Sequence, residues 1–351
     1  MTRLITRFGE LKVDAFLVSA LPNIRYLTGF TGSNALLLLT GAGATLFTDP
    51  RYAIQASAEV ACSVTISRGP LVVAVLASIK RKKLKRIGFE KGRVLFETYA
   101  SLREGLPLGA SLKPLPALIE ELRMIKSDDE ITRIRLSVET NSEAFARTVK
   151  LIRPGITEMD VAAEIEYQMR LLGADKPSFE TIVACGVRTA LPHAHPTRQV
   201  LAANQLLLID MGASRDGYAS DMTRMLFLGK PAPNVRRMYD AVLDAQLAGI
   251  AAVREGVTAG QVDRRVRLRL KAEGLDKAFV HSTGHGLGLE IHEPPRIGKK
   301  DKTVLAAGMA ITIEPGVYIE GTGGIRIEDT VIVTKAGCEV LTPTSKELML
   351  L

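Results

Sequence analysis

Two strand-like segments in the second part of the chain carry a carboxylate where a buried strand would carry an apolar residue. Leu208-Ile209-Asp210-Met211-Gly212 recurs later in the chain as Thr312-Ile313-Glu314-Pro315-Gly316. A buried carboxylate is unfavourable unless a cation or hydrogen bonds compensate it, so few folds tolerate two such strands. The pair therefore predicts that both strands contribute to one polar site.

The segments that precede these strands repeat as well. Residues 152–157, followed by Val161, resemble residues 253–258, followed by Val262. In both copies a helix is expected to end at glycine, and the threonine that closes the segment can cap the next helix. Similar order at nearly the same offset predicts two related halves, each a helix followed by a hairpin.

The first acidic segment is predicted to form a hairpin over residues 206–228. If its two-residue loop is Arg215-Asp216, Asp210 faces Asp221 directly; if the loop is Asp216-Gly217, the two aspartates are diagonal neighbours. Both registers place the carboxylates on one face, within reach of each other.

A second hairpin is predicted from strands at residues 310–319 and 325–333. Pairing Ile319 with Ile325 places Glu314 and Glu328 on one face, with Arg326 nearby. One acid alone would be an ordinary solvated strand residue. Four acids at matching places in two halves favour a functional site.

The histidines occur in the same part of the chain as the acidic strands. All five lie beside the acidic strands: His193, His195, His281, His285 and His292. Glycines flank His285 and allow close backbone approach. Four carboxylates and one imidazole suit two divalent ions, manganese or cobalt first, with iron or zinc as alternatives and calcium disfavoured. Such ions lie roughly 3.5–4 Å apart and hold a hydroxide between them.

Length and composition limit the remaining choices. A chain of 351 residues that is 46% apolar predicts two domains with real cores. The three cysteines are far apart, so a disulfide framework or a thiolate zinc site is not expected. No apolar run is long enough to span a bilayer, and charges interrupt the N-terminus, so a cytoplasmic protein is expected.

The first part is predicted to be an α/β accessory domain over residues 1–116. Its expected strands are residues 15–19, 35–39, 45–48, 64–67 and 86–89, with helices at 51–61 and 98–105. Lys113–Pro116 is expected to be a linker. The second domain, residues 117–351, would begin with a long helical stretch from 117 to 152, bent near Ser127.

The net charge of +8 hints at nucleic acid. Its excess lies in the first part, mostly in the run Lys80–Arg86. The run is either a patch for an acidic partner or a solvated surface segment. No aromatic residue interleaves with the charges, so the solvated segment is favoured and nucleic-acid binding is not expected.

On these motifs the chain resembles the pita-bread metallopeptidases, the family of methionine aminopeptidase, aminopeptidase P and prolidase. The motifs are Ile209–Gly212, Ser220–Arg224, Thr283–Gly288, Ile313–Gly316 and Gly324–Asp329. The resemblance covers almost the whole chain, because the proline-specific members carry an N-terminal α/β domain. It implies an α+β pita-bread C-terminal domain with a pseudo-twofold internal repeat.

The resemblance also implies site residues. The implied metal ligands are Asp210, Asp221, His285, Glu314 and Glu328, with Glu314 also the general base for the hydroxide between the metals. His193 and His292 would contact the substrate and stabilise the tetrahedral intermediate. His281 and Arg326 would order the site, and Phe179 would line the wall for a proline ring. His195 is expected to be a surface-loop histidine.

The function implied is cleavage of the imide bond before proline. An Xaa-Pro dipeptidase (prolidase) is preferred because of the compact length, and aminopeptidase P, which acts on longer peptides, is the alternative. The catalytic motifs do not separate the two, and Arg198 is one candidate for binding a dipeptide's carboxylate. A homodimer is also implied.

Three further alternatives are disfavoured. Methionine aminopeptidase usually lacks the N-terminal domain and a residue like Arg326. Creatinase-like enzymes lack the metal ligands. A non-catalytic binding module is a remote alternative.

Overall fold

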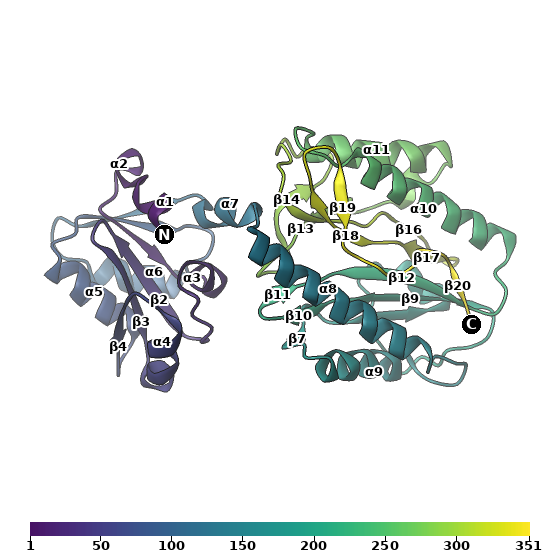
Figure 1. Cartoon of the computed structure of the whole chain (residues 1–351), viewed down its shortest axis with the longest axis horizontal. Coiled ribbons are helices and arrows are strands. Elements are labelled where there is room, and N and C mark those ends of the chain that lie inside the picture. Colours follow the sequence, from purple (N-terminus) through teal and green to yellow (C-terminus); the bar gives the residue numbers. More distant parts are fainter. The chain divides into compact units, whose positions relative to one another are not determined.

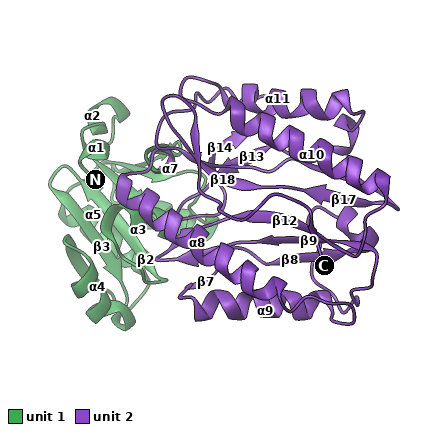
Figure 2. Ribbon diagram, turned by 45° about the vertical axis from the view of Figure 1, so that its right-hand side comes forward, with its two compact units in different colours: residues 1–123 green, residues 124–351 purple.

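A computed structural model describes residues 1–351, which form two compact units, residues 1–123 and 124–351 (Figures 1 and 2). The sequence analysis placed this boundary after residue 116. The first unit extends further because residues 113–115 join its sheet and helix α7 (Leu118–Met124) packs on its core. None of the helices is both long and apolar enough to cross a membrane.

Unit 1 is built on a six-stranded sheet with the order β4-β3-β2-β1-β5-β6. The strands are β1 (Ala15–Val18), β2 (Ala35–Thr40), β3 (Gly43–Thr48), β4 (Ser63–Ile66), β5 (Arg86–Glu90) and β6 (Ser111–Leu115). The five predicted strands are confirmed. The predicted linker is wrong, because Lys113–Leu115 belongs to β6. That strand lies at the sheet edge, where Pro114, which has no N–H to donate, is tolerated.

Helices pack on both faces of this sheet. They are α1 (Thr2–Ile5), α2 (Phe8–Leu11), α3 (Leu21–Thr28), α4 (Ala53–Glu59), α5 (Leu71–Arg81), α6 (Phe96–Gly105) and α7, with a 3₁₀ turn at Pro50–Tyr52. Alternate residues of β1 serve two cores: Phe16 packs with α3 and α7, and Leu17 with α5 and α6. The run Lys80–Arg86 joins α5 to β5 with its charges exposed, as expected for a solvated segment.

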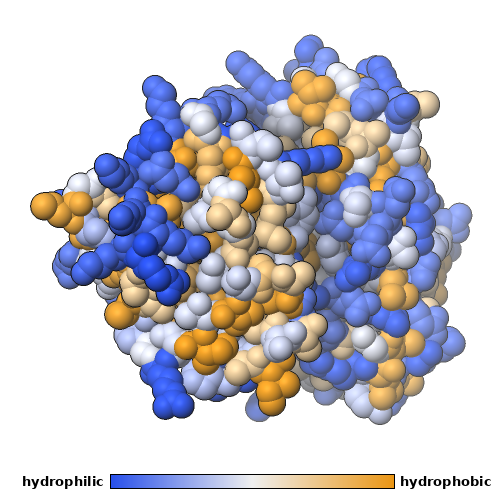
Figure 3. Space-filling model, turned by 60° about the vertical axis from the view of Figure 1, so that its left-hand side comes forward, coloured by the Kyte–Doolittle hydropathy of each residue, from blue (hydrophilic) through white to orange (hydrophobic).

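Unit 1 also keeps large apolar side chains in contact with solvent. Leu95 is 73% exposed, Phe96 82% and Leu108 107%. Figure 3 shows apolar side chains gathered between charged ones on the face turned toward the viewer. Exposed apolar surface is common at contacts with other protein chains. The homodimer stays a prediction.

Unit 2 contains four long helices, with α8 and α9 on one side of its strands and α10 and α11 on the other (Figures 1 and 2). They are α8 (Asp128–Val149), α9 (Glu158–Leu171), α10 (Pro233–Ala252) and α11 (Ala259–Ala272), with 3₁₀ turns at Gly186–Ala190 and Asp276–Ala278. The long helix predicted over 117–152 is therefore two helices, α7 and α8. Ser127 separates them because it caps α8 in a capping box with Glu130.

The strands of unit 2 form several small sheets. The strands are β7 (Lys176–Pro177), β8 (Ile182–Cys185), β9 (Gln205–Met211), β10 (Ala213–Arg215), β11 (Tyr218–Ala219), β12 (Met222–Leu228), β13 (Gly284–Gly286), β14 (Glu293–Ile297), β15 (Ala310–Ile313), β16 (Gly316–Ile319), β17 (Gly323–Arg326), β18 (Asp329–Val333), β19 (Cys338–Val340) and β20 (Met349–Leu350). The two largest have the orders β20-β12-β9-β8 and β14-β13-β15-β18-β19.

The internal repeat is confirmed by its turns. Gly155 and Gly256 both have positive φ, +100° and +85°, which disfavours other residues there. Thr157 caps α9 and Thr258 caps α11, each in a capping box. Each threonine also forms an isolated antiparallel bridge, to Val200 and Val304 respectively. The two halves are therefore built alike.

Strand alternation aims the carboxylates inward. In β9, Leu207 and Ile209 pack against α8 and α9, whereas Leu208 belongs to a core that includes α10 and α11. Asp210 continues the face of Leu208, since side chains two apart share a face. In β15, Ile311 and Ile313 pack with α10 and α11 residues. Glu314 has the opposite facing to Ile313. Asp210 therefore points away from α8 and α9, and Glu314 points away from the face of β15 that packs on α10 and α11.

Candidate active site

The first acidic hairpin adopts the second of the two predicted registers. Asp210 pairs with Thr223, and Asp216 and Gly217, with φ of +51° and +76°, form the tip. Two central residues with positive φ define a type I′ turn, whose twist suits a hairpin. Asp210 and Asp221 are therefore diagonal neighbours.

The second hairpin differs from its predicted register. Ile319 pairs with Gly323 rather than with Ile325, so the predicted pairing is wrong. The strand reaches further toward the tip because Gly323 and Gly324 pack against Thr189: a Cβ on Gly324 would lie 2.2 Å from the carbonyl oxygen of Thr189. The shift is by two residues, so facing is conserved and Glu314 and Glu328 still share a face.

His285 approaches the acids from strand β13. Its neighbours Gly284 and Gly286 admit no side chain, since a Cβ would lie 2.0 Å from Thr312 O and 2.3 Å from Pro294 O. These glycines allow β13 to lie directly against β14 and β15. The backbone N–H of His285 donates to Oγ1 of Thr312 over 3.1 Å, which fixes the residue beside the hairpin.

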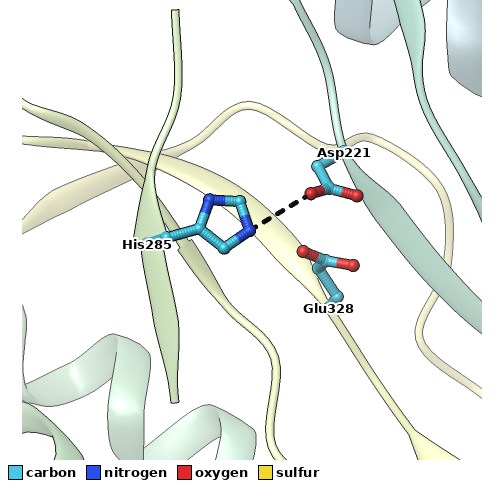
Figure 4. Close-up of side chains that lie close together, drawn as sticks. All are labelled: Asp221, His285 and Glu328. Carbon is cyan, nitrogen blue, oxygen red and sulfur yellow. Dashed lines mark ion pairs between the residues drawn. The ribbon is translucent and has the colours of Figure 1, made fainter. Parts of the chain in front are cut away.

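Three side chains meet at the centre of the site, one from strand β13 and two from the residues directly before β12 and β18 (Figure 4). The ligand atoms of Asp221, His285 and Glu328 all lie within 4.8 Å of one another. His285 Nε2 lies 3.4 Å from Oδ2 of Asp221 and 3.6 Å from Oε1 of Glu314. The arrangement is compact enough for side chains on both hairpins to contact one cation.

Asp210 and Glu328 each have one oxygen held and one left over. Asp210 Oδ2 accepts from Arg326 Nη2 at 2.6 Å, and Glu328 Oε2 accepts from Thr223 Oγ1 at 2.8 Å. Asp210 Oδ1 and Glu328 Oε1 are buried without a hydrogen-bond partner. Buried oxygens of this kind need a compensating group. Divalent cations fit, because these hard oxygen atoms are the ligands that such ions prefer.

The pKa shifts of the buried acids also favour bound cations. Burial raises the pKa of Asp221 well above its ordinary value, and the charges of Asp210 and Glu314 raise it further. Burial, followed by the charge of Asp221, likewise raises the pKa of Glu328, and burial raises the pKa of Glu314. The anionic forms are thus unfavourable together, and positive charge between them would relieve the repulsion.

Arg326 and Tyr318 form the support beneath these ligands. Besides Asp210, the Arg326 guanidinium donates to Thr223 Oγ1 at 3.0 Å, to Pro192 O at 3.1 Å and to Tyr318 OH at 2.7 Å. Burial raises the pKa of Tyr318 to about 12, so its hydroxyl stays protonated at neutral pH. Arg326 therefore connects both hairpins to the loop that contains Pro192, which precedes the first hairpin in the chain.

A second buried network holds His281. Its Nε2 lies 2.9 Å from Tyr318 OH, and its backbone oxygen accepts from Arg267 Nη2 at 2.5 Å. Asp263 in turn binds Arg267 Nε at 2.8 Å and accepts from Thr283 Oγ1 at 2.9 Å. Asp263 and Thr283 are fully buried. Helix α11 thereby fixes the backbone on either side of His281.

The loop that carries His193 has a similar anchor on helix α9. The buried carboxylate of Glu158 accepts from the backbone N–H groups of Cys185 and Thr197 and from Arg188 Nε, at 2.8, 3.0 and 3.1 Å. Arg188 also donates to the backbone oxygen of His195 at 2.8 Å. In each half a buried acid on the second helix thus supports a loop that bears a histidine.

A cavity of about 860 Å³ opens over the carboxylate cluster. It is lined by every residue expected in the site: Phe179, His193, Asp210, Asp221, His281, His285, His292, Glu314, Arg326 and Glu328. His292 stacks edge-on against His285, with ring centroids 4.4 Å apart. The structure therefore brings together all the residues named from the resemblance.

One expectation at the cavity wall is confirmed and another needs revision. His195 lies on a surface loop, as expected, and also lines the rim of the cavity, with Nδ1 3.1 Å from Oε1 of Glu180 and both side chains exposed. Arg198, offered as a carboxylate-binding residue, does not line the cavity, whereas Arg296 does. The cavity wall contains two arginines, Arg296 and Arg326, and no lysine. Arg326 already donates a hydrogen bond to Asp210.

Several supporting residues escaped the sequence analysis. Asp263, Tyr318, Glu158 and Arg296 lie outside the motifs that carried the resemblance. Asp263 and Arg267 are spaced i, i+4 on α11, but that spacing is also typical of exposed helical ion pairs, so it does not distinguish a buried support.

Comparisons with known proteins agree with this architecture. The model of metallopeptidase family M24 matches residues 132–335, and that of the creatinase/prolidase N-terminal domain matches residues 1–125. An uncharacterised peptidase of Bacillus subtilis, YqhT, is 38% identical over 100% of this chain and 99% of its own.

Solved structures of similar proteins extend the agreement to the fold. An Xaa-Pro dipeptidase from Bacillus anthracis superimposes with a TM-score of 0.97 at 38% identity, covering 100% of this chain and 98% of the other. An X-Pro aminopeptidase from Thermotoga maritima gives a TM-score of 0.91 at 34% identity, covering 98% and 100%.

Proposed function

The chain belongs to metallopeptidase family M24, with a creatinase/prolidase N-terminal α/β domain and a pita-bread catalytic domain, and we propose that it is an Xaa-Pro dipeptidase. The observation that carries the proposal is the pair of buried, unpartnered oxygens of Asp210 and Glu328 at the cavity lined by the expected site residues. The relatives at 35–38% identity that bear the name Xaa-Pro dipeptidase support the substrate class.

Five residues would hold the metals: Asp210, Asp221, His285, Glu314 and Glu328. Two divalent ions, manganese or cobalt by preference, would supply Lewis acidity for the scissile carbonyl and lower the pKa of an attacking water. The protein holds these side chains ready through Thr223, Thr312 and Arg326.

Glu314 is the proposed general base. It lines the cavity, and its Oε1 lies 3.4 Å from Thr312 Oγ1 and 3.6 Å from His285 Nε2. Its carboxylate takes a proton from water as the water oxygen bonds to the carbonyl carbon. The same proton is then available to the proline nitrogen when the C–N bond breaks, and that nitrogen needs it because it bears no hydrogen.

The histidines at the wall would stabilise the intermediate. His193 and His292 face the cavity, and burial, with His285 and His193 nearby, lowers the pKa of His292. A neutral imidazole can donate one N–H to a developing oxyanion. Phe179 supplies an apolar surface on the same wall, suited to a proline ring.

A dipeptidase must also bind the C-terminal carboxylate of its substrate. Arg296 is the cavity arginine that no carboxylate engages, and it replaces Arg198 as our candidate. Arg296→Ala is therefore expected to raise KM for an Xaa-Pro dipeptide more than it lowers kcat.

Aminopeptidase P activity is the second candidate. It is favoured by the likeness to the X-Pro aminopeptidase of Thermotoga maritima and by a cavity of about 860 Å³, which has room for more than a dipeptide.

The deciding experiment compares Ala-Pro with Ala-Pro-Ala-Ala in the presence of Mn²⁺. We expect a higher kcat/KM for the dipeptide, whereas the reverse preference would assign the aminopeptidase activity. Glu314→Gln should abolish hydrolysis of both peptides. If that variant hydrolyses them as fast as the parent protein, Glu314 is not the base. A homodimer and a cytoplasmic location stay predictions.

A further inference from the structure

A second cavity adjoins the active-site cavity. Its volume is about 640 Å³, and it shares with the first cavity the wall residues His281, Ser282, Arg296 and Asp301. Arg296, the residue proposed to bind the dipeptide carboxylate, thus stands at the boundary between the two spaces. A peptide whose chain continues beyond proline would enter the second cavity there.

Positive charge dominates this second cavity. Arg267, Arg296, Lys299 and Lys300 line it, with Asp301 as its acid. Arg267 is already paired with Asp263. Asp301 keeps its charge, and its Oδ1 accepts from the backbone N–H of Thr303 at 2.7 Å.

The remaining cations are free to meet a ligand. Arg296, Lys299 and Lys300 are exposed and make no ion pair. Lys299 also lines a smaller neighbouring cavity, where Arg264, Arg267 and Lys271 join it and outnumber the acids Asp263 and Asp276. Convergent cations of this kind attract carboxylates, both directly and by steering.

We propose that the second cavity is a subsite for a carboxylate carried by the residue that follows proline in a longer peptide. Arg296 lines both cavities, so the residue that follows a proline held there, about 3.5 Å further along an extended chain, enters the cavity that Lys299 and Lys300 line. The inference rests on the proposed peptidase function and deepens it. The site takes Xaa-Pro dipeptides and, among longer peptides, selects acidic ones.

The carboxylate has two sources, the side chain and the C-terminus of the third residue. Three peptides separate them: Ala-Pro-Glu, Ala-Pro-Gln and Ala-Pro-Gln amide. Glu and Gln have nearly the same shape, so their difference reports the side-chain charge. The amide removes the terminal charge as well.

Binding is measured by calorimetry on the Glu314→Gln protein, so that the peptides remain intact and a result is obtained without turnover. We expect Ala-Pro-Glu to bind about 2–5-fold more tightly than Ala-Pro-Gln, the range expected for one exposed ion pair. A greater loss with the amide than with Ala-Pro-Gln assigns part of the effect to the C-terminus. The preference should weaken as salt is raised.

The critical variant is Lys299→Glu/Lys300→Glu, made in the same background. Its matched control, Lys230→Glu/Lys335→Glu, makes the same change in net charge at two exposed lysines that line neither cavity. The cavity variant should lose the preference for Ala-Pro-Glu and keep its affinity for Ala-Pro, and the control should keep both.

Equal binding of all three peptides to the Glu314→Gln protein, or a preference for the charged peptides that persists in the cavity variant, overturns the inference. Neither outcome bears on dipeptide hydrolysis, which is tested separately on the parent protein. A protein that fails to cleave Ala-Pro but binds Ala-Pro-Glu through Lys299 and Lys300 would overturn the dipeptidase proposal alone.

Discussion

The guanidinium of Arg326 donates from Nη2 to Oδ2 of Asp210 over 2.6 Å, and this contact joins the two acidic hairpins. It leaves Oδ1 of Asp210 buried and without a hydrogen bond. One oxygen is therefore fixed by the protein while the other remains for a cation. Such supporting donors orient metal ligands and tune their charge.

Replacing Arg326 with Met should lower kcat/KM for an Xaa-Pro dipeptide by about 10–100-fold, the usual cost of losing a group that orients a metal ligand. Metal content per chain, measured by atomic absorption, should fall as well. Arg236→Met is the control, because Arg236 forms an exposed pair with Asp240 at 2.9 Å. Full activity and full metal content in Arg326→Met would show that Asp210 needs no orientation.

Removal of metal should destabilise the protein, because the buried carboxylates then repel one another. We expect a lower Tm in calorimetry after chelation, and recovery with Mn²⁺. Glu328→Gln should act in the opposite direction: it removes one buried charge and keeps an acceptor for Thr223 Oγ1. The metal-free variant should therefore have a higher Tm than the metal-free parent, by a few degrees, and gain less from Mn²⁺. A metal-free variant less stable than the metal-free parent would contradict this account of the cluster.

The placement of the carboxylates could be predicted from the sequence because strand facing has a period of two. The two acids of each hairpin share a face in either of two registers. Even with the wrong pairing of Ile319 they stay on one face, because the observed register differs by two residues. The register itself depended on contacts distant in sequence. Thr189 packs against Gly324, and no local pattern in the second hairpin encodes that neighbour.

Other features depended on tertiary context in the same way. Lys113–Pro116 has the two prolines of a linker, and only the pairing of Lys113–Leu115 beside β5 makes that segment a strand. Helix α5 was not predicted, because its run from Leu71 is apolar all round and short apolar runs do not reveal their period. Arg296 differs from Arg198 only by its position in the folded chain, since both are isolated arginines near histidines.

Asp263→Asn should reduce activity although Asp263 touches no substrate and no proposed metal ligand. It is a positioning residue: without its charge, Arg267 is held less firmly, and the backbone oxygen of His281 loses a fixed donor. We expect kcat/KM to fall about tenfold with metal content unchanged, and Asp263→Glu to recover part of it. Asp129→Asn, which disrupts an exposed Asp–Arg pair of the same i, i+4 spacing, should change neither quantity. Loss of metal in parallel with activity would show instead that the site as a whole collapses.

The pH dependence of stability should report the burial of His281. Burial lowers the pKa of His281 to about 4 from its ordinary value of 6.5, only partly opposed by its contact with the backbone oxygen of Ser282. Between these two values the unfolded chain binds a proton that the folded protein does not, so the free energy of unfolding falls as the pH falls. The contribution is complete above pH 6.5 and decreases by at most about 1.4 kcal/mol per pH unit toward pH 4.

This contribution can be isolated by urea unfolding of the metal-free parent and of His281→Gln between pH 4.5 and 7.5. The carboxylate cluster titrates in both proteins and therefore cancels in the difference between their free energies of unfolding. That difference should shift in favour of the variant as the pH is lowered, because glutamine gains no proton in either state. A difference that is constant over the whole range would mean that His281 titrates alike in the folded and unfolded chains. Burial would then not keep its imidazole neutral.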